Sequence, residues 1–343
     1  MDRPFVSAIT LAHGEEPWLE ETVSALLASR DIDVEVILVD NGCTSDQVAR
    51  VAGQAGVTVL RPGTNLGFCA GCNLGVRHAK GDYIALVNGD AAVDRDALCR
   101  LVEAAARTDV GIASASVRLA DDRSVLNSGG NDIHFLGFSW AGRHGLPADP
   151  AEREHEVMGA CGGGLAMRRE VWDQVGGFDE EYFGFHEDVY LSLRAWQLGF
   201  RVVYVPEARV FHHYEFSRNP RKFYLLERNR EIVLLTMWEA RTLVLIAPVL
   251  LLAEMAVMAL AVRQGWWRQK VAAWVWLVRN RRWLTGRRST LQGTRRVSDA
   301  ELAPRLSARL DPTNFDLPSL ARPLNAILAG YWGVVRRFLR SPR

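Results

Sequence analysis

Short apolar runs alternate with longer amphipathic segments from the start of the chain to about residue 120. The apolar runs are rich in β-branched residues and have the length of buried strands; they are Val6–Leu11, Val34–Val39, Val57–Leu60, Tyr83–Val87 and Val110–Val117. The segments between them carry apolar side chains at helical spacing, at residues 17–28, 44–52, 65–78 and 94–106. This alternation predicts a parallel, doubly wound α/β sheet with right-handed crossovers.

The alternation weakens at residues 118–156, where Gly, Asp, Ser and Pro are frequent. We expect loops there, with room for a hairpin. Regular structure returns with Gly162-Gly163-Gly164, where the backbone can approach a ligand or another strand closely. The elements expected after it are helices at 169–175, 187–198 and 222–237 and strands at 201–204 and 208–211.

Polar side chains collect at the ends of the predicted strands, at Asp40, Asn65, Asn88 and Asp90. Open α/β sheets bind their ligands at the carboxyl ends of the strands. The sequence has neither a G-x-G-x-x-G after the first strand nor a G-x-x-x-x-G-K-[ST] phosphate loop. The pattern therefore favours a nucleotide site built from carboxylates and amides, with a hard cation holding the phosphates. The alternative is that Asp40 and Asp94 only cap helices.

The composition is that of a folded protein with a sizeable core: 343 residues, 48% hydrophobic and 24% charged, enough for one large domain or two ordinary ones. Five cysteines in no regular framework favour reduced, cytoplasmic thiols. Cys69 and Cys72 form a lone C-x-x-C, which we interpret as small packed residues rather than a zinc or redox site. No signal peptide is visible, because Met1–Phe5 leads directly into a strand.

The net charge of +1 hides two halves of opposite sign. Residues 1–240 hold 23 Lys and Arg against 35 Asp and Glu, whereas residues 241–343 hold 18 against 5 and carry six of the 11 Trp. The two halves are expected to meet different surroundings, so we place a domain boundary at residue 240.

Five short motifs carry a resemblance to a known family. They are Val39-Asp40-Asn41-Gly42; Asn65-Leu66-Gly67-Phe68 with Asn73; Asn88-Gly89-Asp90; Gly177-Phe178-Asp179-Glu180 with Glu187-Asp188; and His212 with Arg228-Asn229. In this order, over about 235 residues, the chain resembles the family 2 glycosyltransferases, and among them the bacterial rhamnosyltransferase-like branch. The resemblance implies a GT-A type, doubly wound mixed α/β sheet flanked by helices, with catalysis in residues 1–240.

The resemblance also implies a nucleotide-sugar pocket. Asp40 would recognise the base, and Asn65, Gly67 and Asn73 would line the pocket together with Asn88 and Asp90. Arg228 would pair either with a phosphate or with an acid of the core.

A divalent cation, Mg²⁺ or Mn²⁺, is the implied cofactor. Asn88 and Asp90 stand at the two acidic places of the family's D-x-D motif, and Asp90 would be a metal ligand. His212 is a possible further ligand, with His213 as its competitor; the alternative is an ordinary strand-end histidine.

Asp188 matches the family's general base, and a single base on the acceptor side implies inversion at the anomeric carbon. The implied acceptor-side residues are Gly163, Phe178, Asp179 and Glu187. Tyr190 stands where the family usually has a second Asp, so the acceptor side departs from the pattern. The alternative for Glu187-Asp188 is a negatively charged helix N-terminus stabilised by the helix dipole.

The C-terminal part has the features of a membrane-associated region. Thr242–Val262 is long enough to cross a bilayer, but Pro248 and Glu254 weaken that interpretation. From Arg263 to Arg296 there are ten Lys and Arg and no acids, interspersed with Trp, as at an interface with anionic lipids.

A single crossing would place this basic segment outside, against the positive-inside tendency. We therefore expect a re-entrant or in-plane helical hairpin, with a last amphipathic helix near Leu324–Leu339. The alternative is a soluble helical domain; nucleic-acid binding would not need the long apolar run.

The sequence thus predicts an inverting glycosyltransferase at the cytoplasmic face of a bacterial plasma membrane. It would transfer a sugar such as rhamnose from dTDP-rhamnose to a lipid-linked or cell-envelope glycan. The alternatives are a UDP-hexose donor and a catalytically silent sugar-nucleotide-binding or scaffold protein. A nucleotidyltransferase would need a basic Gly-rich phosphate loop near the N-terminus, and the sequence has none.

Overall fold

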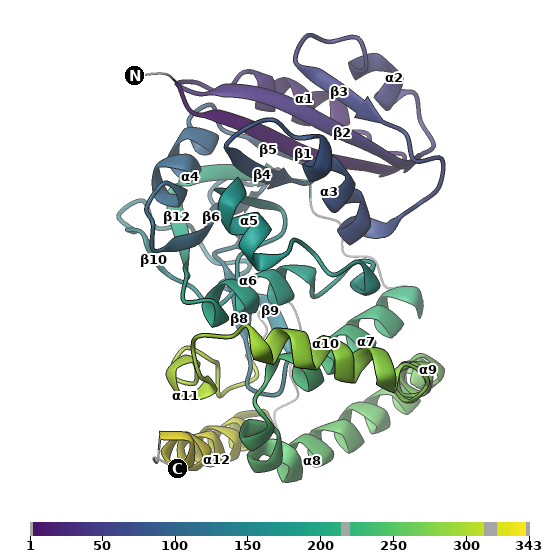
Figure 1. Ribbon diagram of the computed structural model, residues 1–343, viewed down its shortest axis with the longest axis vertical. Helices are drawn as coiled ribbons and strands as arrows, with labels where there is room; N and C mark the ends of the chain where they lie inside the picture. The colour runs from purple at the N-terminus through teal and green to yellow at the C-terminus, as the bar shows by residue number, and fades with distance from the viewer. Residues whose placement is uncertain (1–2, 214–219, 312–320, 341–343) are drawn as a thin grey trace. The chain divides into compact units, whose positions relative to one another are not determined.

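The computed structural model describes residues 3–213, 220–311 and 321–340 (Figure 1). The chain divides into two compact units. Met1–Asn131, Ala141–Ala195 and Phe200–Glu215 form the first unit; Asp132–Trp140, Trp196–Gly199 and Phe216–Arg343 form the second.

The first unit is built on a mixed sheet whose main path has the strand order β10-β12-β6-β11-β4-β1-β2-β3, with β5 added to β12 and β7 to β6. The strands are β1 (Phe5–Gly14), β2 (Asp33–Cys43), β3 (Val57–Leu60), β4 (Tyr83–Val87), β5 (Ala91–Val93), β6 (Val110–Leu119), β7 (Leu126–Ser128), β10 (His155–Glu156), β11 (Gly164–Arg168) and β12 (Arg201–His212). β1, β2, β3 and β4 pair in parallel, as do β6 and β12. β11 runs antiparallel to both β4 and β6, so the sheet is mixed rather than wholly parallel.

Helices flank this sheet (Figure 1): α1 (Leu19–Leu27), α2 (Gln47–Val51), α3 (Gly67–His78), α4 (Ala97–Ala105), α5 (Arg169–Val175) and α6 (Glu187–Gln197), with the short 3-10 helix η1 (Glu180–Tyr182). α1 buries Leu19, Val23 and Leu26 completely, and each such side chain contributes about 1.5–3 kcal/mol. α3 is rich in small residues because it lies close to β1: a Cβ on Gly75 would come within 2.5 Å of Ile9 Cγ2. Cys69 and Cys72 are buried in this helix as small core residues.

Three local expectations differ from the structure. The strands expected at 201–204 and 208–211 form one strand, β12, whose register against β6 shifts between Val205 and Arg209. Asp94 does not occupy the N-cap of α4, which is Asp96, and instead forms an ion pair with Arg209 at 3.1 Å. The region expected as loops with room for a hairpin contains the paired strands β8 and β9 (Asn131–Ile133 and Ser139–Ala141), and beyond that expectation it also contributes β7 and β10 to the main sheet.

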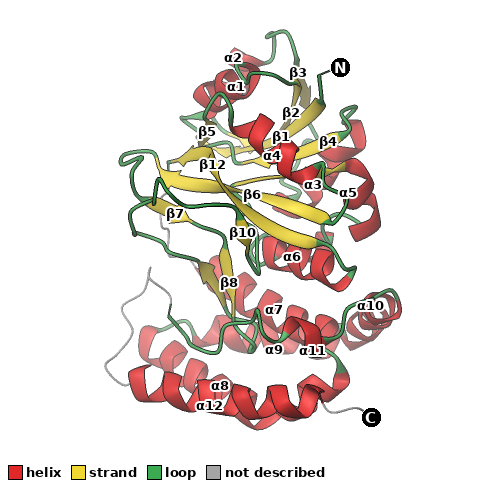
Figure 2. Cartoon of the chain, turned by 90° about the vertical axis from the view of Figure 1, so that its left-hand side faces the viewer, coloured by secondary structure: helices red, strands yellow, loops and turns green. Residues whose placement is uncertain are grey.

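The second unit is helical (Figure 2): α7 (Pro220–Met237), α8 (Ala240–Gln264), α9 (Trp267–Arg279), α10 (Arg281–Gly293), α11 (Asp299–Leu302) and α12 (Ala321–Arg340). Its core is aromatic. The rings of Phe135 and Trp332 stack at 4.6 Å, and Trp238 Nε1 donates to the Phe135 carbonyl at 2.9 Å. The division therefore differs from the predicted boundary at residue 240, because α7 and two internal segments, 132–140 and 196–199, group with the C-terminal helices.

Candidate active site

Asp90 and His212 are brought together by the pairing of two strands. Asp90 follows β4, and β5 then pairs antiparallel with the end of β12, placing Ala91 opposite His212. Asp90 Oδ1 lies 3.0 Å from His212 Nε2. Gly89 has to be glycine here, because a Cβ would come within 2.5 Å of the Leu11 carbonyl oxygen. Asp90 and His212, which the sequence predicted as metal ligands from distant parts of the chain, thus face each other.

The orientation of the His212 ring is set by a residue that the sequence did not reveal. His212 Nδ1 lies 2.9 Å from Asn127 Oδ1, so Nδ1 carries the proton and donates to that oxygen. The other nitrogen, Nε2, lies 3.0 Å from Asp90 Oδ1 and 3.5 Å from Asn88 Nδ2. One imidazole and one carboxylate fit a divalent cation whose remaining ligands come from a diphosphate and water.

His213 faces a different set of groups. Its ring stacks on Trp18 with centroids 3.7 Å apart, and its Nε2 lies 3.6 Å from Glu21 Oε2. His212 rather than His213 is therefore the histidine beside Asp90.

A second carboxylate, Glu16, belongs to this neighbourhood and was missed by sequence reasoning. Burial, and then the negative charge of Asp90, raise the pKa of Glu16 to about 7. Glu16 lies two residues after the end of β1, so the strand-end rule that selected Asp90 is the signal that could have found it.

Asp40 lies near the carboxyl end of β2, and Asn65 follows β3, the neighbouring strand of the sheet. Asp40 Oδ1 accepts a hydrogen bond from the Cys43 amide at 3.0 Å, and its other oxygen lies 3.8 Å from Arg61 Nε. Asp40 does not cap α2, whose N-cap is Asp46. Asn65 Oδ1 accepts from the Gly67 amide at 2.8 Å, so this side chain also shapes its own loop.

Gly67 is required by packing. Its φ is +82°, and a Cβ there would come within 2.5 Å of the Phe183 carbonyl oxygen. The buried Asn41 side chain ties this loop down, donating to the Gly67 carbonyl at 3.1 Å and accepting from the Leu66 amide at 2.8 Å.

Asn73, Phe178 and Asp179 are held by local structure. The Asn73 amide group bonds both the carbonyl and the amide of Phe178, at 2.9 and 3.1 Å, and so attaches the turn before η1 to α3. The Phe178 ring is buried against Trp172, and Asp179 caps η1 by accepting from the Glu181 amide. Their predicted roles toward ligands are therefore not needed to explain why these residue types occur here.

Asp188 is fixed at the start of α6 by a second unpredicted residue, Asn131. Asn131 Nδ2 donates to Asp188 Oδ2 at 2.7 Å and to the Ala160 carbonyl at 3.0 Å. Asp188 Oδ1 accepts from the Val189 amide at 2.8 Å. Both carboxylate oxygens are thereby aligned, as a positioned proton acceptor requires.

The glycines expected to allow close approach lie between the two halves of the site. A Cβ on Gly162 would lie 3.6 Å from Asp188 Cβ, and a Cβ on Gly163 would lie 3.7 Å from Asn88 Nδ2. The Gly163 carbonyl also accepts from the Asn88 amide at 3.4 Å. This short loop therefore links the Asn88–Asp90 group to Glu187 and Asp188.

The two adjacent carboxylates have perturbed acidities. Burial, and then the charge of Asp188, raise the pKa of Glu187 to about 8. Burial also raises the pKa of Asp188, although hydrogen bonds from backbone amides and Asn131 oppose this rise. These hydrogen bonds favour the ionised form of Asp188, whereas burial favours the protonated form of both carboxyl groups.

The loop before this pair is strained, because Phe183, Phe185 and His186 all have φ between +63° and +65°. Left-handed conformations of such bulky residues are costly and concentrate at functional sites.

Arg228 lies in the second unit, on α7. Its Nε donates to Asn229 Oδ1 at 2.9 Å, and its guanidinium packs over the rings of Tyr224 and Trp276. The resemblance implied that Arg228 pairs with a phosphate or with an acid of the core. In the structure, Arg228 contacts an amide oxygen and two aromatic rings.

Comparison with known proteins agrees with this geometry. Residues 7–176 match the family Glycosyl transferase family 2. The chain is 31% identical over 232 residues to an N-acetylglucosaminyl-diphospho-decaprenol L-rhamnosyltransferase of Mycobacterium tuberculosis, a match that covers 61% of this chain and 75% of that protein.

Two solved structures show the same GT-A fold. GalNAc-T7 with UDP, GalNAc and Mn²⁺ aligns with a TM-score of 0.57 at 16% identity, over 70% of this chain and 49% of its own. The mannosyltransferase PcManGT from Pyrobaculum calidifontis, in complex with GDP-Man and Mn²⁺, aligns with a TM-score of 0.50 at 18% identity, over 99% of this chain and 86% of its own. The chain is a glycosyltransferase and belongs to glycosyl transferase family 2.

Proposed function

We propose that this enzyme is an inverting transferase that moves rhamnose from dTDP-rhamnose to a lipid-linked or cell-envelope glycan at the cytoplasmic face of a bacterial membrane. The observation that carries the proposal is the arrangement of Asp90 and His212 on one side of the Gly162-Gly163 loop and of Asp188 on the other. The relative's name joins L-rhamnosyl transfer to a decaprenol-linked acceptor, which supports the donor and acceptor classes.

On the donor side, Asp90 and His212 would hold a divalent cation. When bound, such a cation supplies charge neutralisation to the departing diphosphate. The role of Asn127 is to keep the His212 ring in the tautomer that offers Nε2. Asp40, at the same edge of the sheet, would contact the base.

On the acceptor side, Asp188 would accept the proton of the attacking hydroxyl. Asn131 holds one of its oxygens by a hydrogen bond of 2.7 Å, so the carboxylate is aimed before the acceptor arrives. The pKa of Glu187 is raised to about 8 by burial and then by the charge of Asp188, which favours its neutral form beside the base at neutral pH. With Asp188 as the base and the acceptor hydroxyl as the attacking group, the sugar carbon is substituted once and its configuration inverts.

The test is a transfer assay with dTDP-rhamnose and, in parallel, UDP-hexoses, using a prenyl-diphosphate-linked sugar in vesicles as acceptor. Replacing Asp188 by Asn should lower turnover by about 10²–10⁴-fold and leave stabilisation by the donor in thermal unfolding unchanged. Asp173→Asn, which alters an exposed carboxylate on α5, is the control and should keep full turnover.

Three results would contradict parts of the proposal. Normal turnover in Asp188→Asn would show that Asp188 is not the base. A product with retained configuration at the sugar carbon would show that the enzyme is not inverting. Transfer from UDP-hexoses but not from dTDP-rhamnose moves the enzyme to the other donor class.

A further inference from the structure

Helix α8 presents an unusually apolar and exposed surface. Its most apolar 18 residues have a mean hydropathy of 2.5, and only 6% of them are buried, so α8 does not have the burial of a core helix. Val244, Leu251, Leu252 and Val262 are each at least 59% exposed, and Met255 and Leu260 lie among them. Exposed apolar surface on this scale marks a site of interaction.

A second amphipathic helix lies beside α8 (Figure 2). Tyr331 Oη of α12 donates to the Leu245 carbonyl at 2.6 Å, and Arg241 Nη2 donates to the Phe338 carbonyl at 2.6 Å. α12 exposes apolar side chains of its own, at Leu324, Ile327, Val334 and Phe338.

Cations border the apolar stretch rather than interrupt it. Arg241 and Arg263 stand near the two ends of α8, and Arg337 and Arg340 lie in the last turn of α12. Apolar residues framed by arginines complement the acyl region and the anionic headgroups of a lipid leaflet.

The elements before and after α8 are packed against each other. Only Trp238 and Glu239 join α7 to α8, and only Gly265 and Trp266 join α8 to α9. Lys270 Nζ of α9 donates to Glu227 Oε2 of α7 at 2.5 Å. A single crossing by α8 would put α7 and α9 on opposite sides of a membrane and break this buried pair.

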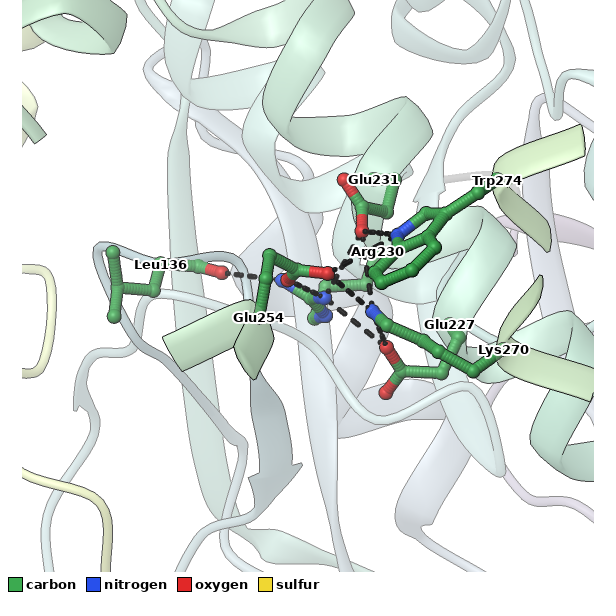
Figure 3. Close-up of polar contacts among 7 residues, drawn as sticks. All are labelled: Leu136, Glu227, Arg230, Glu231, Glu254, Lys270 and Trp274. Atoms are coloured by element: carbon green, nitrogen blue, oxygen red, sulfur yellow. Dashed lines mark hydrogen bonds and ion pairs between the residues drawn. The ribbon is translucent and has the colours of Figure 1, made fainter. Parts of the chain in front are cut away.

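The inner side of α8 carries the only ionisable residue between Arg241 and Arg263, Glu254 (Figure 3). Its carboxylate pairs with Arg230 of α7 and Lys270 of α9, whose side chains are 1% and 0% exposed. Trp274 Nε1 donates to the same carboxylate at 3.3 Å. If α8 crossed a bilayer, Glu254 would move toward its centre and leave two buried cations short of an anion.

We propose that α8 lies in the plane of one membrane leaflet. Its outer face of Val244, Leu251, Leu252 and Val262 enters the acyl region, and Glu254 holds its inner face on α7 and α9. The partner is a bilayer containing anionic lipid. The proposal rests on the proposed function, because a lipid-linked acceptor presents its reactive sugar at the surface of the leaflet in which α8 would lie.

The test measures how deep α8 sits. Single cysteines are placed at Val244, Leu252 and Val262 in full-length protein with Cys43, Cys99 and Cys161 replaced by Ser. Each is labelled with an environment-sensitive fluorophore and bound to phosphatidylcholine–phosphatidylglycerol vesicles that contain lipids with quenchers at graded depths. A label at Asp121, an exposed loop residue, is the control and should not be quenched.

An in-plane helix predicts that the three labels lie at one shallow depth and are quenched from the same leaflet. A label at Leu252 that is clearly deeper than the other two, with those quenched from opposite leaflets, would show a span and overturn the proposal. Absence of quenching at all three positions overturns it as well, and concentration-dependent self-association would then assign the face to a second copy of the chain.

A variant separates this proposal from the enzymatic one. Leu251→Ser with Leu252→Ser should lower vesicle binding and the use of a lipid-linked acceptor by at least about tenfold, since two buried leucines are lost from the leaflet. Transfer to a water-soluble acceptor analogue should stay unchanged. In-plane depths without transfer from any donor would leave the membrane face standing and remove the proposed function.

Discussion

Replacing Glu187 by Gln should stabilise the protein, by an amount that grows with pH. The pKa of Glu187 is raised from 4.5 to about 8 in the folded protein, chiefly by burial and then by the charge of Asp188. Between these two values the unfolded chain has released the proton and the folded chain still holds it. The folded state therefore binds more protons, and the free energy of unfolding falls as the pH rises through this window.

The magnitude follows from the same shift. One proton contributes about 1.4 kcal/mol per pH unit, so the whole window from 4.5 to about 8 has a ceiling of about 5 kcal/mol. Part of the rise comes from the charge of the neighbouring Asp188, which can itself take up a proton, so we expect about 1–3 kcal/mol. Glutamine has the shape of the protonated acid and carries no charge at any pH, so the variant avoids this loss.

The assay is urea unfolding of wild type and Glu187→Gln at about pH 5, 6, 7 and 8, with the slope against urea checked for constancy. Glu170→Gln, which changes an exposed glutamate on α5, is the control and should follow wild type at every pH. The reasoning is refuted if the advantage of Glu187→Gln is the same at about pH 5 and pH 8, or larger at the lower value.

Three further changes test other parts of the structure. Asp90→Ala should abolish the metal-dependent part of donor binding in calorimetry; equal donor affinity with and without EDTA in both proteins would remove the metal. Gly67→Ala should lower the free energy of unfolding by about 2–4 kcal/mol, because a Cβ would overlap the Phe183 carbonyl. Gly63 has a similar φ and nothing within 4 Å of its Cβ position, so Gly63→Ala should lower it by only about 1 kcal/mol. Equal losses in the two variants would show that the contact with Phe183 is irrelevant. Lys270→Met should destabilise by about 3–5 kcal/mol, and adding Glu254→Leu should recover part of this; a further loss in the double variant would contradict the pairing.

The part of the site that follows from strand ends was accessible to sequence reasoning. Asp90 and Asn88 end a strand with a clear apolar pattern, and the sheet topology brings His212 to them. Asn127 and Asn131 were not accessible, because they lie where no periodicity fixes the chain and a polar residue reads as an ordinary loop.

Motif residues also proved to have local tasks that a sequence pattern does not display. The amide of Asn73 holds the Phe178 backbone, and Gly67 makes room for Phe183. The two compact units do not follow the charge, which changes sign at residue 240, because packing is decided by apolar side chains such as Phe135, which lies far upstream.

The discontinuous second unit has a consequence for biosynthesis. Phe135 leaves the ribosome well before Trp332, the ring on which it stacks, and at ordinary elongation rates of 5–20 residues per second the delay is about 10–40 s. Throughout that interval the Phe135 ring lacks its stacking partner, although Trp238, which donates to the Phe135 carbonyl, is synthesised earlier. A nonsense mutation before α12 would remove the ring that covers Phe135, and we expect the shortened chain to be degraded faster than the full-length protein.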